Sequence, residues 1–338
     1  MELAATHEMN RISDPKEFAI AIDIGGTKVD VGVIDISGTR LLQPEIIDVP
    51  FNESGVADPK KLVDLVEPLV LKAGEIPGEL KGIGLSCCGN IDQETGNAVL
   101  VANLHWKNIP IGEMFKNAYN LPVFAATDVR MAAIGELVWG AAKNCSNFAW
   151  ATIGTGYGGY LFLSGNLYDG YHGFAGNFGH ITLDEINGYP CGCGRKGCFE
   201  TFVAGPAIAR AGQNAADSYE SEFLKEISTS RKITTRDVFR GETAGDLVCN
   251  RILEDVIRLV SINLGGVVNT LDLEMLILGG GVAKASPDFI SRIDKRIRDY
   301  LMTDEAKRDL VVTKESFTNS ALFGAASDVF LRQGILEI

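Results

Sequence analysis

The sequence predicts an α/β protein built from two similar halves, and three observations predict it. Short segments rich in Val, Ile and Leu alternate with stretches of helical spacing along most of the chain. The order of strand pair, helix and strand occurs twice. A glycine-rich turn follows a predicted strand at three places. The length of 338 residues is sufficient for two domains with full hydrophobic cores.

The first half opens with a predicted hairpin. Residues 18–24 and 29–36 are rich in β-branched and aliphatic side chains, with GGTK between them. Residues 58–73 have helical spacing, although Pro68 is expected to kink or interrupt that helix because proline lacks a backbone N–H. The further strands predicted in this half are 82–88 and 121–126.

The second half repeats this order. The predicted elements are a helix at 129–141, strands at 148–153 and 160–164, a helix through roughly 245–270, a strand at 274–278, a helix near 287–301, a strand at 310–313 and a closing helix from about 319. Between them, residues 166–205 are dense in Gly and Cys and lack long periodic segments. We therefore expect this region to be rich in loops and held together by something other than regular structure.

Composition excludes several classes of protein. Hydrophobic residues make up 46% and charged residues 22%, which is typical of a globular chain rather than a disordered or fibrous one. The net charge is −13, with 31 Lys and Arg against 44 Asp and Glu, and this balance argues against nucleic acid as the main partner. We see no apolar run of the roughly 20 residues that span a bilayer, and we predict no membrane partner. The N-terminus MELAATHEMNRISDPKE lacks the apolar segment of a signal peptide, so we expect a cytoplasmic protein.

The first glycine turn has the composition of a phosphate-binding loop. It comprises Asp23, Gly25, Gly26, Thr27 and Lys28. Glycines let backbone N–H groups approach an anion, a Thr hydroxyl and a Lys can complete the cradle, and the preceding carboxylate can orient magnesium through water. The alternative is a plain hairpin with a flexible turn, and turn chemistry alone leaves both interpretations open.

Two later turns extend this pattern. Gly154, Gly156 and Gly159 match G-x-G-x-x-G after a strand, but YLFLSGN follows where a dinucleotide site needs a helix, so a second hairpin is favoured. Gly279–Gly281 lie between a strand and a helix, either as a nucleotide-facing turn or as a tight connection. Each turn alone is a weak signal, but three together favour a bound nucleoside triphosphate.

A cysteine cluster predicts a metal site. Cys191, Cys193 and Cys198, with His180 eleven residues before the first of them, supply four ligands for tetrahedral zinc. The alternative of three unrelated buried thiols is disfavoured, because CGCGRKGC contains almost no apolar residues. No open ligand position is evident, so we expect a structural zinc ion. The uneven distribution of the seven cysteines also fits a reduced compartment.

Asp128 directly precedes the helix predicted at 129–141. It is either the N-cap of that helix or a general base that accepts a proton from an attacking hydroxyl group. The two roles are compatible.

These residues together resemble the ROK family of repressors, open reading frames and sugar kinases. The resemblance covers the chain from residue 18 to the C-terminus and rests on eight motifs in order: DIGGTK, GLSCCGNID, NLHWKNIP, DVRMAAIGE, GTGYGG, GNFGH, CGCGRKGCFE and LGGG. It implies an α/β fold of two ribonuclease-H-like lobes of the sugar kinase, Hsp70 and actin superfamily around a central cleft. The small lobe would comprise 1–127 plus 318–338, and the large lobe 128–317 with a zinc-binding region at 176–200.

The resemblance also implies an ATP-dependent carbohydrate kinase, acting mostly on O6 of a hexose, with Mg²⁺ and structural Zn²⁺, and assembled as a homodimer or homotetramer. Asp128 would be the catalytic base. The phosphates and nucleoside of ATP would contact Asp23, Gly25, Gly26, Thr27, Lys28, Thr155, Gly156, Gly280 and Gly281. The sugar would contact Gly89, Asn103, Asp128, Asn177, His180 and Glu200. His180, Cys191, Cys193 and Cys198 would bind zinc.

Four residues depart from the family pattern: Thr127 replaces a common Asn, Arg130 a small polar residue, Asn177 a Glu, and Cys88 a Pro. Thr127 and Asn177 fall in the sugar pocket implied by the resemblance, whereas the base and phosphate loops are intact. We therefore expect kinase chemistry with an altered acceptor, either a less common hexose, an amino sugar or a cyclitol. A catalytically weak sugar-binding regulator is the alternative. A repressor is disfavoured, because only 17 residues precede the first predicted strand and a helix-turn-helix module needs about 60.

Overall fold

The computed structural model describes residues 17–338, so the expectation about a signal peptide falls largely on residues 1–16, outside the described residues. The chain divides into two compact units. The first ends at Thr127 and also includes Ala325–Glu337, and the second comprises Asp128–Gly324 with Ile338. Each unit is built on a five-stranded sheet. Within residues 17–338 no helix is both long enough and apolar enough to cross a membrane.

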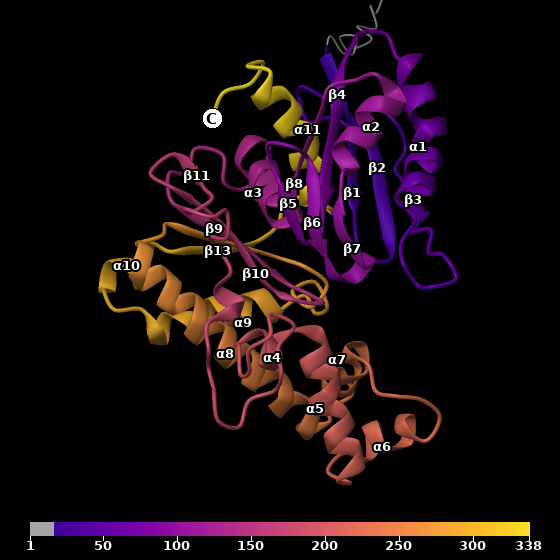
Figure 1. The fold of residues 1–338 in the computed structure, drawn as a ribbon. Coiled ribbons are helices and arrows are strands. Elements are labelled where there is room, and N and C mark those ends of the chain that lie inside the picture. Colours follow the sequence, from indigo (N-terminus) through magenta and orange to yellow (C-terminus); the bar gives the residue numbers. More distant parts are fainter. Residues whose placement is uncertain (1–16) are drawn as a thin grey trace, which may run out of the picture. The chain divides into compact units, whose positions relative to one another are not determined.

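The sheet of the first unit has the order β3-β2-β1-β4-β8 (Figure 1). The predicted hairpin is present as β1 and β2, which pair antiparallel, while β4 runs parallel to β1 and β8 parallel to β4. The inner strands are buried on both faces, which explains their near-continuous apolar sequence. The strands are β1 (Glu17–Ile24), β2 (Lys28–Asp35), β3 (Glu45–Asp48), β4 (Glu79–Cys87) and β8 (Val123–Thr127).

Helices cover both faces of this sheet. Helices α1 (Pro59–Gly74) and α2 (Ile111–Tyr119) lie on one face, and the end of α11 (Ser320–Arg332) lies on the other (Figure 1). The carbonyl of Ala325 approaches Gly84 so closely that a Cβ there would lie 1.9 Å from its oxygen. A small antiparallel sheet adds β5 (Asn90–Asp92), β6 (Asn97–Val101) and β7 (Trp106–Ile109), with the 3₁₀ turn η1 (Ala102–Leu104) between the last two.

Pro68 was expected to kink or interrupt the helix. It does not interrupt it, because α1 continues through Pro68 to Gly74. Pro68 lies on the exposed face, whereas Val66 and Leu69 on either side of it are buried. Packing of the apolar face holds the helix together, and the carbonyl that loses its N–H partner belongs to exposed Asp64.

The sheet of the second unit repeats the topology of the first. Its order is β11-β10-β9-β12-β13, again with three antiparallel strands followed by two parallel ones. This repetition confirms the predicted two similar halves. The strands are β9 (Phe148–Ile153), β10 (Tyr157–Leu163), β11 (Asn166–Tyr168), β12 (Met275–Gly279) and β13 (Val311–Lys314).

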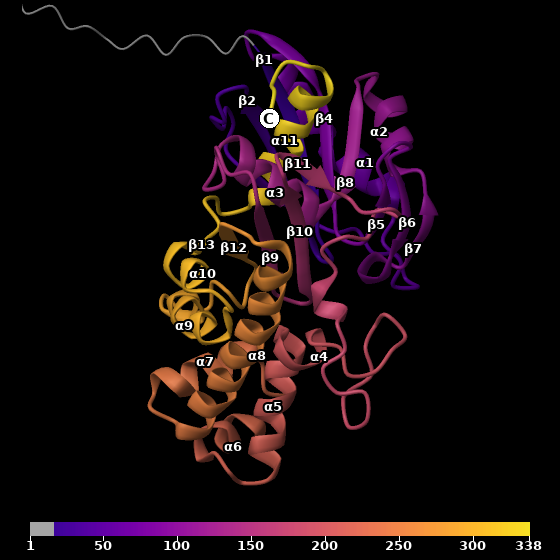
Figure 2. The ribbon, with the colours of Figure 1, turned by 90° about the vertical axis from the view of Figure 1, so that its left-hand side faces the viewer.

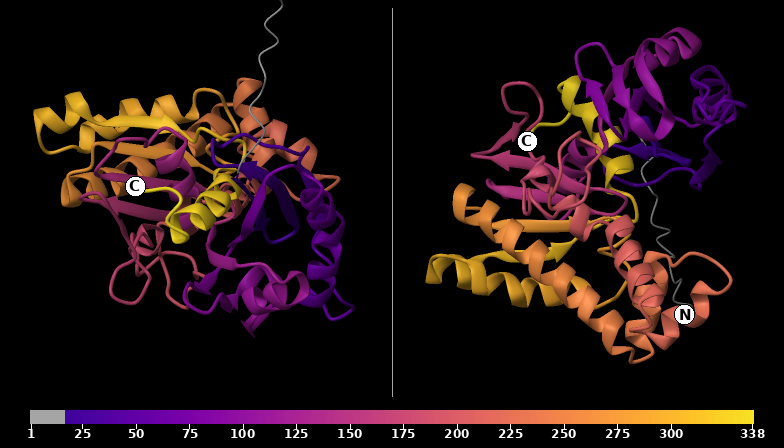
Figure 3. Two further views of the ribbon diagram at one scale, coloured as in Figure 1. Left: turned by 90° about the horizontal axis from the view of Figure 1, so that it is seen from above. Right: turned by 60° about the horizontal axis from the view of Figure 1, so that its bottom comes forward.

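Helix α3 (Asp128–Val138) packs against β9 and β10, whereas α8 (Leu247–Leu271) and α9 (Phe289–Ile297) run side by side over the hydrophobic core of the unit (Figure 3). Figure 2 shows a group of shorter helices at one end of α8. These are α4 (Glu200–Val203), α5 (Gly205–Asp217), α6 (Glu222–Ser228) and α7 (Thr235–Thr243), while η2 (Phe178–His180), η3 (Arg298–Tyr300) and α10 (Asp304–Asp309) complete the unit. Residues 166–205 are rich in loops, as predicted.

Candidate active site

The first glycine turn joins β1 to β2. The N–H of Gly25 donates to the carbonyl of Lys28 at 2.9 Å, which closes the turn. A Cβ on Gly26 would lie 3.0 Å from Cβ of Asn103, so the turn lies against η1 and has little room for a larger residue. Thr27 and Lys28 are exposed, and Lys28 Nζ lies 3.5 Å from the exposed carboxylate of Asp48. Such an exposed pair is weak, which leaves the ammonium group available to an anion.

Other candidate residues of the first unit lie at strand ends beside this turn. Asp23, near the end of β1, accepts a 2.6 Å hydrogen bond from Ser86 Oγ on the adjacent parallel strand β4. Gly89 follows β4 with φ of +114°, and a Cβ there would lie 2.7 Å from the carbonyl oxygen of Leu100. Only glycine fits this position without strain. The first unit therefore brings together Asp23, the glycine turn and Asn103.

Asp128 is the first residue of α3, and its Oδ1 accepts from the N–H of Val129 at 2.9 Å. Its carboxylate is thus held at a helix N-terminus. One half-turn along, Arg130 is buried, with Nε 3.4 Å from Oδ1 of Asp169. The hydroxyl of Tyr160 donates to the same carboxylate oxygen at 2.5 Å. The buried Arg130 therefore has a partly exposed counter-charge, Asp169, near the helix start.

The second glycine turn joins β9 to β10, and no helix follows it, which confirms a hairpin and excludes the dinucleotide-binding motif. The N–H of Gly154 donates to the carbonyl of Gly156 at 2.9 Å. This turn occupies the same position in the second sheet as the first glycine turn occupies in its own. The repeated fold thus places two glycine hairpins at equivalent sites.

The third glycine turn follows β12. Gly280 has φ of +92°, and a Cβ there would lie 2.6 Å from the carbonyl oxygen of Ile153 and from Oγ1 of Thr152. The second and third turns are neighbours, because a Cβ on Gly154 would lie 3.6 Å from the nitrogen of Gly281. The parallel pairing of β12 with β9 brings the two turns together at the carboxyl ends of these strands.

These two turns border a pocket of about 1260 Å³ within the second unit. Apolar side chains of α7 and its surroundings form one part of the lining, and three cations also reach it. Such a mixture suits a ligand with a flat apolar part and a charged part. The lining includes Gly154, Thr155, Gly205, Phe223, Ile233, Arg236, Phe239, Arg240, Gly281, Val282 and Lys284.

The segment that carries Asn177 and His180 is fixed to β10 by close backbone contacts. A Cβ on Gly176 would lie 2.2 Å from the carbonyl oxygen of Gly159, and one on Gly179 would lie 1.7 Å from that of Tyr157. Only glycine permits this approach. Asn177 is exposed and donates from Nδ2 to the carbonyl of Phe174 at 2.9 Å, while His180 is half-buried.

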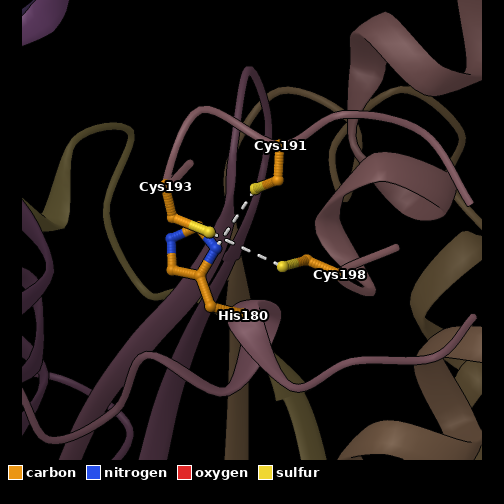
Figure 4. A group of neighbouring side chains, drawn as sticks. All are labelled: His180, Cys191, Cys193 and Cys198. Carbon is orange, nitrogen blue, oxygen red and sulfur yellow. Dashed lines mark hydrogen bonds between the residues drawn. The ribbon is translucent and has the colours of Figure 1, made fainter. Parts of the chain in front are cut away.

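The four predicted metal ligands converge in the second unit (Figure 4). Their ligand atoms all lie within 4.8 Å of one another. Cys193 Sγ lies 3.7 Å from Cys198 Sγ, and Cys191 Sγ lies 3.5 Å from Nδ1 of His180. With Zn–S bonds of about 2.3 Å and Zn–N bonds of about 2.0 Å, a tetrahedral site has S···S and S···N separations of about 3.8 and 3.5 Å. The geometry therefore fits zinc.

The thiols have contrasting acidities. Burial raises the pKa of the Cys191 thiol to about 12. At Cys193 burial also acts to raise the pKa, but hydrogen bonds from Arg195 outweigh it and lower the pKa to about 7. Three thiolates this close repel one another, and a divalent cation at their centre would hold all three deprotonated.

Comparison with known proteins identifies the family, since the ROK family model matches residues 19–330. The chain belongs to the ROK family. The glucokinase of Halalkalibacterium halodurans is 29% identical over 289 residues, which covers 84% of this chain and 86% of that protein. The xylose repressor of Bacillus spizizenii is 28% identical over 283 residues, covering 83% of this chain and 68% of the repressor.

A solved ROK structure matches both the fold and the length of this chain. The ROK family glucokinase of Streptomyces griseus, in complex with glucose and AMPPNP, has a TM-score of 0.77 and 27% identity. The match covers 94% of this chain and 100% of that one. The α/β fold predicted from the sequence is therefore confirmed as that of the ROK sugar kinases.

Glu200 connects two parts of the site in this ROK chain. Its Oε2 accepts from the N–H of Tyr157 at 2.9 Å, at the end of the second glycine turn. Its Oε1 lies 3.6 Å from Sγ of Cys191. One carboxylate thus spans the metal cluster and the glycine turn, so ordering of the cluster restrains the turn.

The residues of α7, and those directly before it in the chain, line the pocket but were not predicted from the sequence. Arg236 and Arg240 are four residues apart on one face of this helix. A detectable signal was present in T-x-x-D at Thr234–Asp237, since Thr234 caps the helix and Asp237 accepts from its backbone N–H at 2.9 Å. The pocket arises from tertiary packing that this local signal does not specify.

Proposed function

We propose that this chain is an ATP-dependent carbohydrate kinase that transfers the γ-phosphoryl group to a hydroxyl of a hexose or hexose-like sugar, with O6 as the acceptor atom. The observation that carries the proposal is the pair of glycine hairpins at equivalent positions of two repeated sheets, with a pocket of about 1260 Å³ beside the second. The similarity to a ROK glucokinase in complex with glucose and AMPPNP supports it. In this proposal the two lobes are 1–127 with 318–338, and 128–317.

Backbone N–H groups of the glycine turns contact the phosphates in this proposal, because they are donors that approach an anion without steric hindrance. Asp23 would orient magnesium through a bound water molecule, and the magnesium ion would neutralise phosphate charge during transfer. Gly280 and Gly281 adjoin the nucleoside. The residues assigned to ATP are Asp23, Gly25, Gly26, Thr27, Lys28, Thr155, Gly156, Gly280 and Gly281.

Asp128 is the general base in this proposal. Its carboxylate takes the proton of the acceptor hydroxyl while the hydroxyl oxygen bonds to the γ-phosphorus. The bond from that phosphorus to the oxygen bridging it to the β-phosphate breaks, and ADP leaves with both bonding electrons. The products are a sugar phosphate, ADP and the proton now held by Asp128.

The sugar site in this proposal comprises Gly89, Asn103, Asp128, Asn177, His180 and Glu200. With zinc on Nδ1 of His180, as the distance to Cys191 favours, Nε2 of the imidazole is left to bond a sugar hydroxyl. Asn177 offers one acceptor and one donor where a carboxylate would accept two bonds. That difference favours an amino sugar, cyclitol or less common hexose as the acceptor.

An acceptor screen tests the proposal directly. ADP release with MgATP is measured over hexoses, hexosamines, N-acetylhexosamines and cyclitols, with wild type and Asp128→Ala. We expect turnover with at least one acceptor and a loss of about 10²- to 10⁴-fold in Asp128→Ala, in line with general-base catalysis. Normal turnover by Asp128→Ala would contradict the assigned mechanism.

Two other functions can be distinguished from a kinase by direct measurements. The similarity to a xylose repressor makes a sugar-responsive repressor the second candidate, and sequence-specific duplex binding in a gel shift would favour it. Tight sugar binding in calorimetry, without phosphoryl transfer to any acceptor, would indicate a catalytically weak sugar-binding regulator. For the kinase we also propose a homodimer or homotetramer, which light scattering on the purified protein distinguishes.

A further inference from the structure

A fully buried carboxylate lies away from all the residues assigned above. Glu136, two turns beyond Asp128 on α3, has no exposed surface. Its Oε1 accepts from the N–H of Ser316 at 2.6 Å and from Ser320 Oγ at 2.8 Å. Its Oε2 accepts from Ser316 Oγ at 2.6 Å and from the N–H of Ala141 at 2.9 Å. When Ser320 donates to Glu136, these four donors match the acceptor capacity of an ionised carboxylate.

A second buried carboxylate continues the chain of contacts. Ser320 Oγ also lies 2.8 Å from Oε2 of Glu315. A hydroxyl has one hydrogen, so Ser320 donates to one of the two carboxylates at a time. On its other side, Oε1 of Glu315 lies 2.6 Å from Nζ of Lys284, whose charge compensates it, and accepts from the N–H of Gly280 at 3.3 Å.

This network ends at the third glycine turn. Lys284 and Gly281 line the pocket of about 1260 Å³. Gly280, which connects β12 to Gly281, has a left-handed backbone conformation. A Cβ on Gly279 would lie 2.7 Å from Oε1 of Glu315, so the carboxylate also fixes the strand end by contact. The position of the turn therefore depends on where Glu315 is held.

The other end of the network is helix α3, which begins at Asp128. Glu136 lies about 12 Å further along the axis of α3, at a rise of 1.5 Å per residue. The backbones of α3 and α11 touch here, since a Cβ on Gly135 would lie 2.5 Å from the carbonyl oxygen of Ser320. The close contact of the two backbones thus places Glu136 at the start of α11.

We propose that Glu136 is a positioning residue for the nucleotide: through Ser320 and Glu315 it fixes the third glycine turn and Lys284 relative to the helix of Asp128. This inference rests on the proposed function, since it assigns the pocket to a nucleotide. The predicted effect concerns the nucleotide rather than the sugar. Loss of the network moves the turn that borders the pocket, whereas the residues assigned to the sugar make none of its contacts.

The test measures binding rather than turnover. Calorimetry with AMPPNP and magnesium is performed on wild type, Ser320→Ala and Glu136→Gln. Glu136→Gln keeps the shape but turns an amide donor toward groups that themselves donate. We expect the Kd for AMPPNP to rise about five- to thirtyfold in both variants, and the double variant to be little worse than either. The KM for ATP should rise similarly, with the KM for the sugar changing less than about twofold.

Ser261→Ala is the matched control, because Ser261 is fully buried in α8 and its hydroxyl makes no hydrogen bond in the described part of the chain. Its Kd for AMPPNP should equal that of wild type. Unchanged binding of AMPPNP by folded Ser320→Ala would overturn the inference while leaving the proposed function intact. Failure of the wild-type protein to bind AMPPNP would overturn both. An equal rise in the KM values for ATP and for the sugar would show a merely structural role.

Discussion

At the scale of single residues, Asn177 is the departure from the family pattern that bears most directly on acceptor choice in the proposed sugar site. The family pattern has a carboxylate there, and Asn177 is exposed on the segment fixed to β10. We expect Asn177→Glu to raise kcat/KM for glucose about 10- to 100-fold, because a hydrogen bond to a charged group contributes about 1.5–3 kcal/mol. The measurement compares kcat/KM for glucose and for the best acceptor of the wild type.

Asn177→Gln is the control for side-chain length, since it adds a methylene group without a charge. Its kcat/KM for glucose should remain near the wild-type value. Equal gains in Asn177→Glu and Asn177→Gln would show that length rather than charge limits the use of glucose, and no gain in either would remove Asn177 from the sugar site.

Sequence reasoning identified residues whose role is visible in a local motif. The four predicted metal ligands lie within 19 positions and converge in the structure. Glu136, Ser320 and Glu315 were missed, because Glu136 meets Ser316 and Ser320 across 180 or more positions and no local pattern marks such a pairing. A Glu near the end of a helix is ordinarily exposed, whereas this one is buried against Ser316 and the start of α11.

At the scale of elements, the third glycine turn makes a sharp prediction. Gly280→Ala places a Cβ 2.6 Å from two oxygens at a φ of +92°. We expect the free energy of unfolding to fall by about 1–3 kcal/mol or more, because the backbone must leave this conformation or strain it. Urea unfolding followed by circular dichroism measures the change.

The neighbouring glycine provides the comparison for stability. Gly281 has no heavy atom within 4 Å of its ideal Cβ position. Gly281→Ala should therefore leave the free energy of unfolding within about 0.5 kcal/mol of wild type. Equal destabilisation by both substitutions would mean that flexibility of the turn, rather than steric fit at Gly280, determines its stability.

The start of α7 predicts a pH dependence. A hydrogen-bonded ion pair with Arg231 holds the pKa of buried Asp237 well below its usual range. Because the pKa is lowered in the folded state, this stabilisation is present above the unfolded pKa of about 3.9 and is lost as the pH falls toward the folded value. We expect Asp237→Asn to lower the free energy of unfolding by about 2 kcal/mol at pH 7, and by progressively less below pH 4.

Urea unfolding at pH 7, 5 and 3 measures this difference. Asp304→Asn is the control, because Asp304 also lies in the first turn of a helix but is 95% exposed. It should change stability little at any of these pH values. A difference between wild type and Asp237→Asn that is the same at pH 3 as at pH 7 would contradict an ionic origin.

The sequence predicted the strands beside the glycine turns well, but not the short edge strands. The strands next to glycine turns were predicted within a few residues, because apolar runs and turn residues bound them sharply. Edge strands β3 and β11 were missed, since they have only four and three residues and alternate between partial and full exposure. Pro68 shows the opposite limit, where tertiary packing overrides a local helix breaker.

At the scale of the whole molecule, the repeated topology was predictable because both halves carry the same order of strand pairs and glycine turns. The short helices around α5–α7 were not, since they form the pocket by packing on α8. The fold therefore consists of a repeated framework, visible in the sequence, and additions whose place is set by tertiary contacts. The region at 176–200 is one such addition, and it contains the four predicted metal ligands.

We expect the purified protein to contain about one zinc ion per chain, as a four-ligand site of this type binds one metal. Removal of zinc with a chelator should lower the Tm, because an ion bound by Cys191, Cys193 and Cys198 would link a loop region with little regular structure, and its binding free energy would add to the folding free energy. Sugar affinity should fall with the metal, because His180 belongs to both sites in the proposal. Metal analysis, thermal unfolding and sugar titration measure the three effects.

Two cysteine variants separate the cluster from the other thiols. Cys193→Ser should lose most of the bound zinc and reproduce the lower Tm of the chelated protein, since a hydroxyl is a poor zinc ligand. Cys145→Ser is the control, because Cys145 Sγ contacts Met275 and belongs to no metal cluster found in residues 17–338. Two results would contradict this role of the cluster. One is full retention of zinc by Cys193→Ser, and the other is an unchanged Tm of the wild type after the chelator has removed the metal. Either would show that backbone contacts hold the loop region instead. Those contacts are present, since Cys191 and Arg195 as well as Leu183 and Gly197 pair through backbone hydrogen bonds of 2.8 and 2.7 Å. Three thiolates gathered around one point beside His180 nevertheless repel one another, so the backbone contacts alone leave the cluster without the positive charge that a zinc ion would supply.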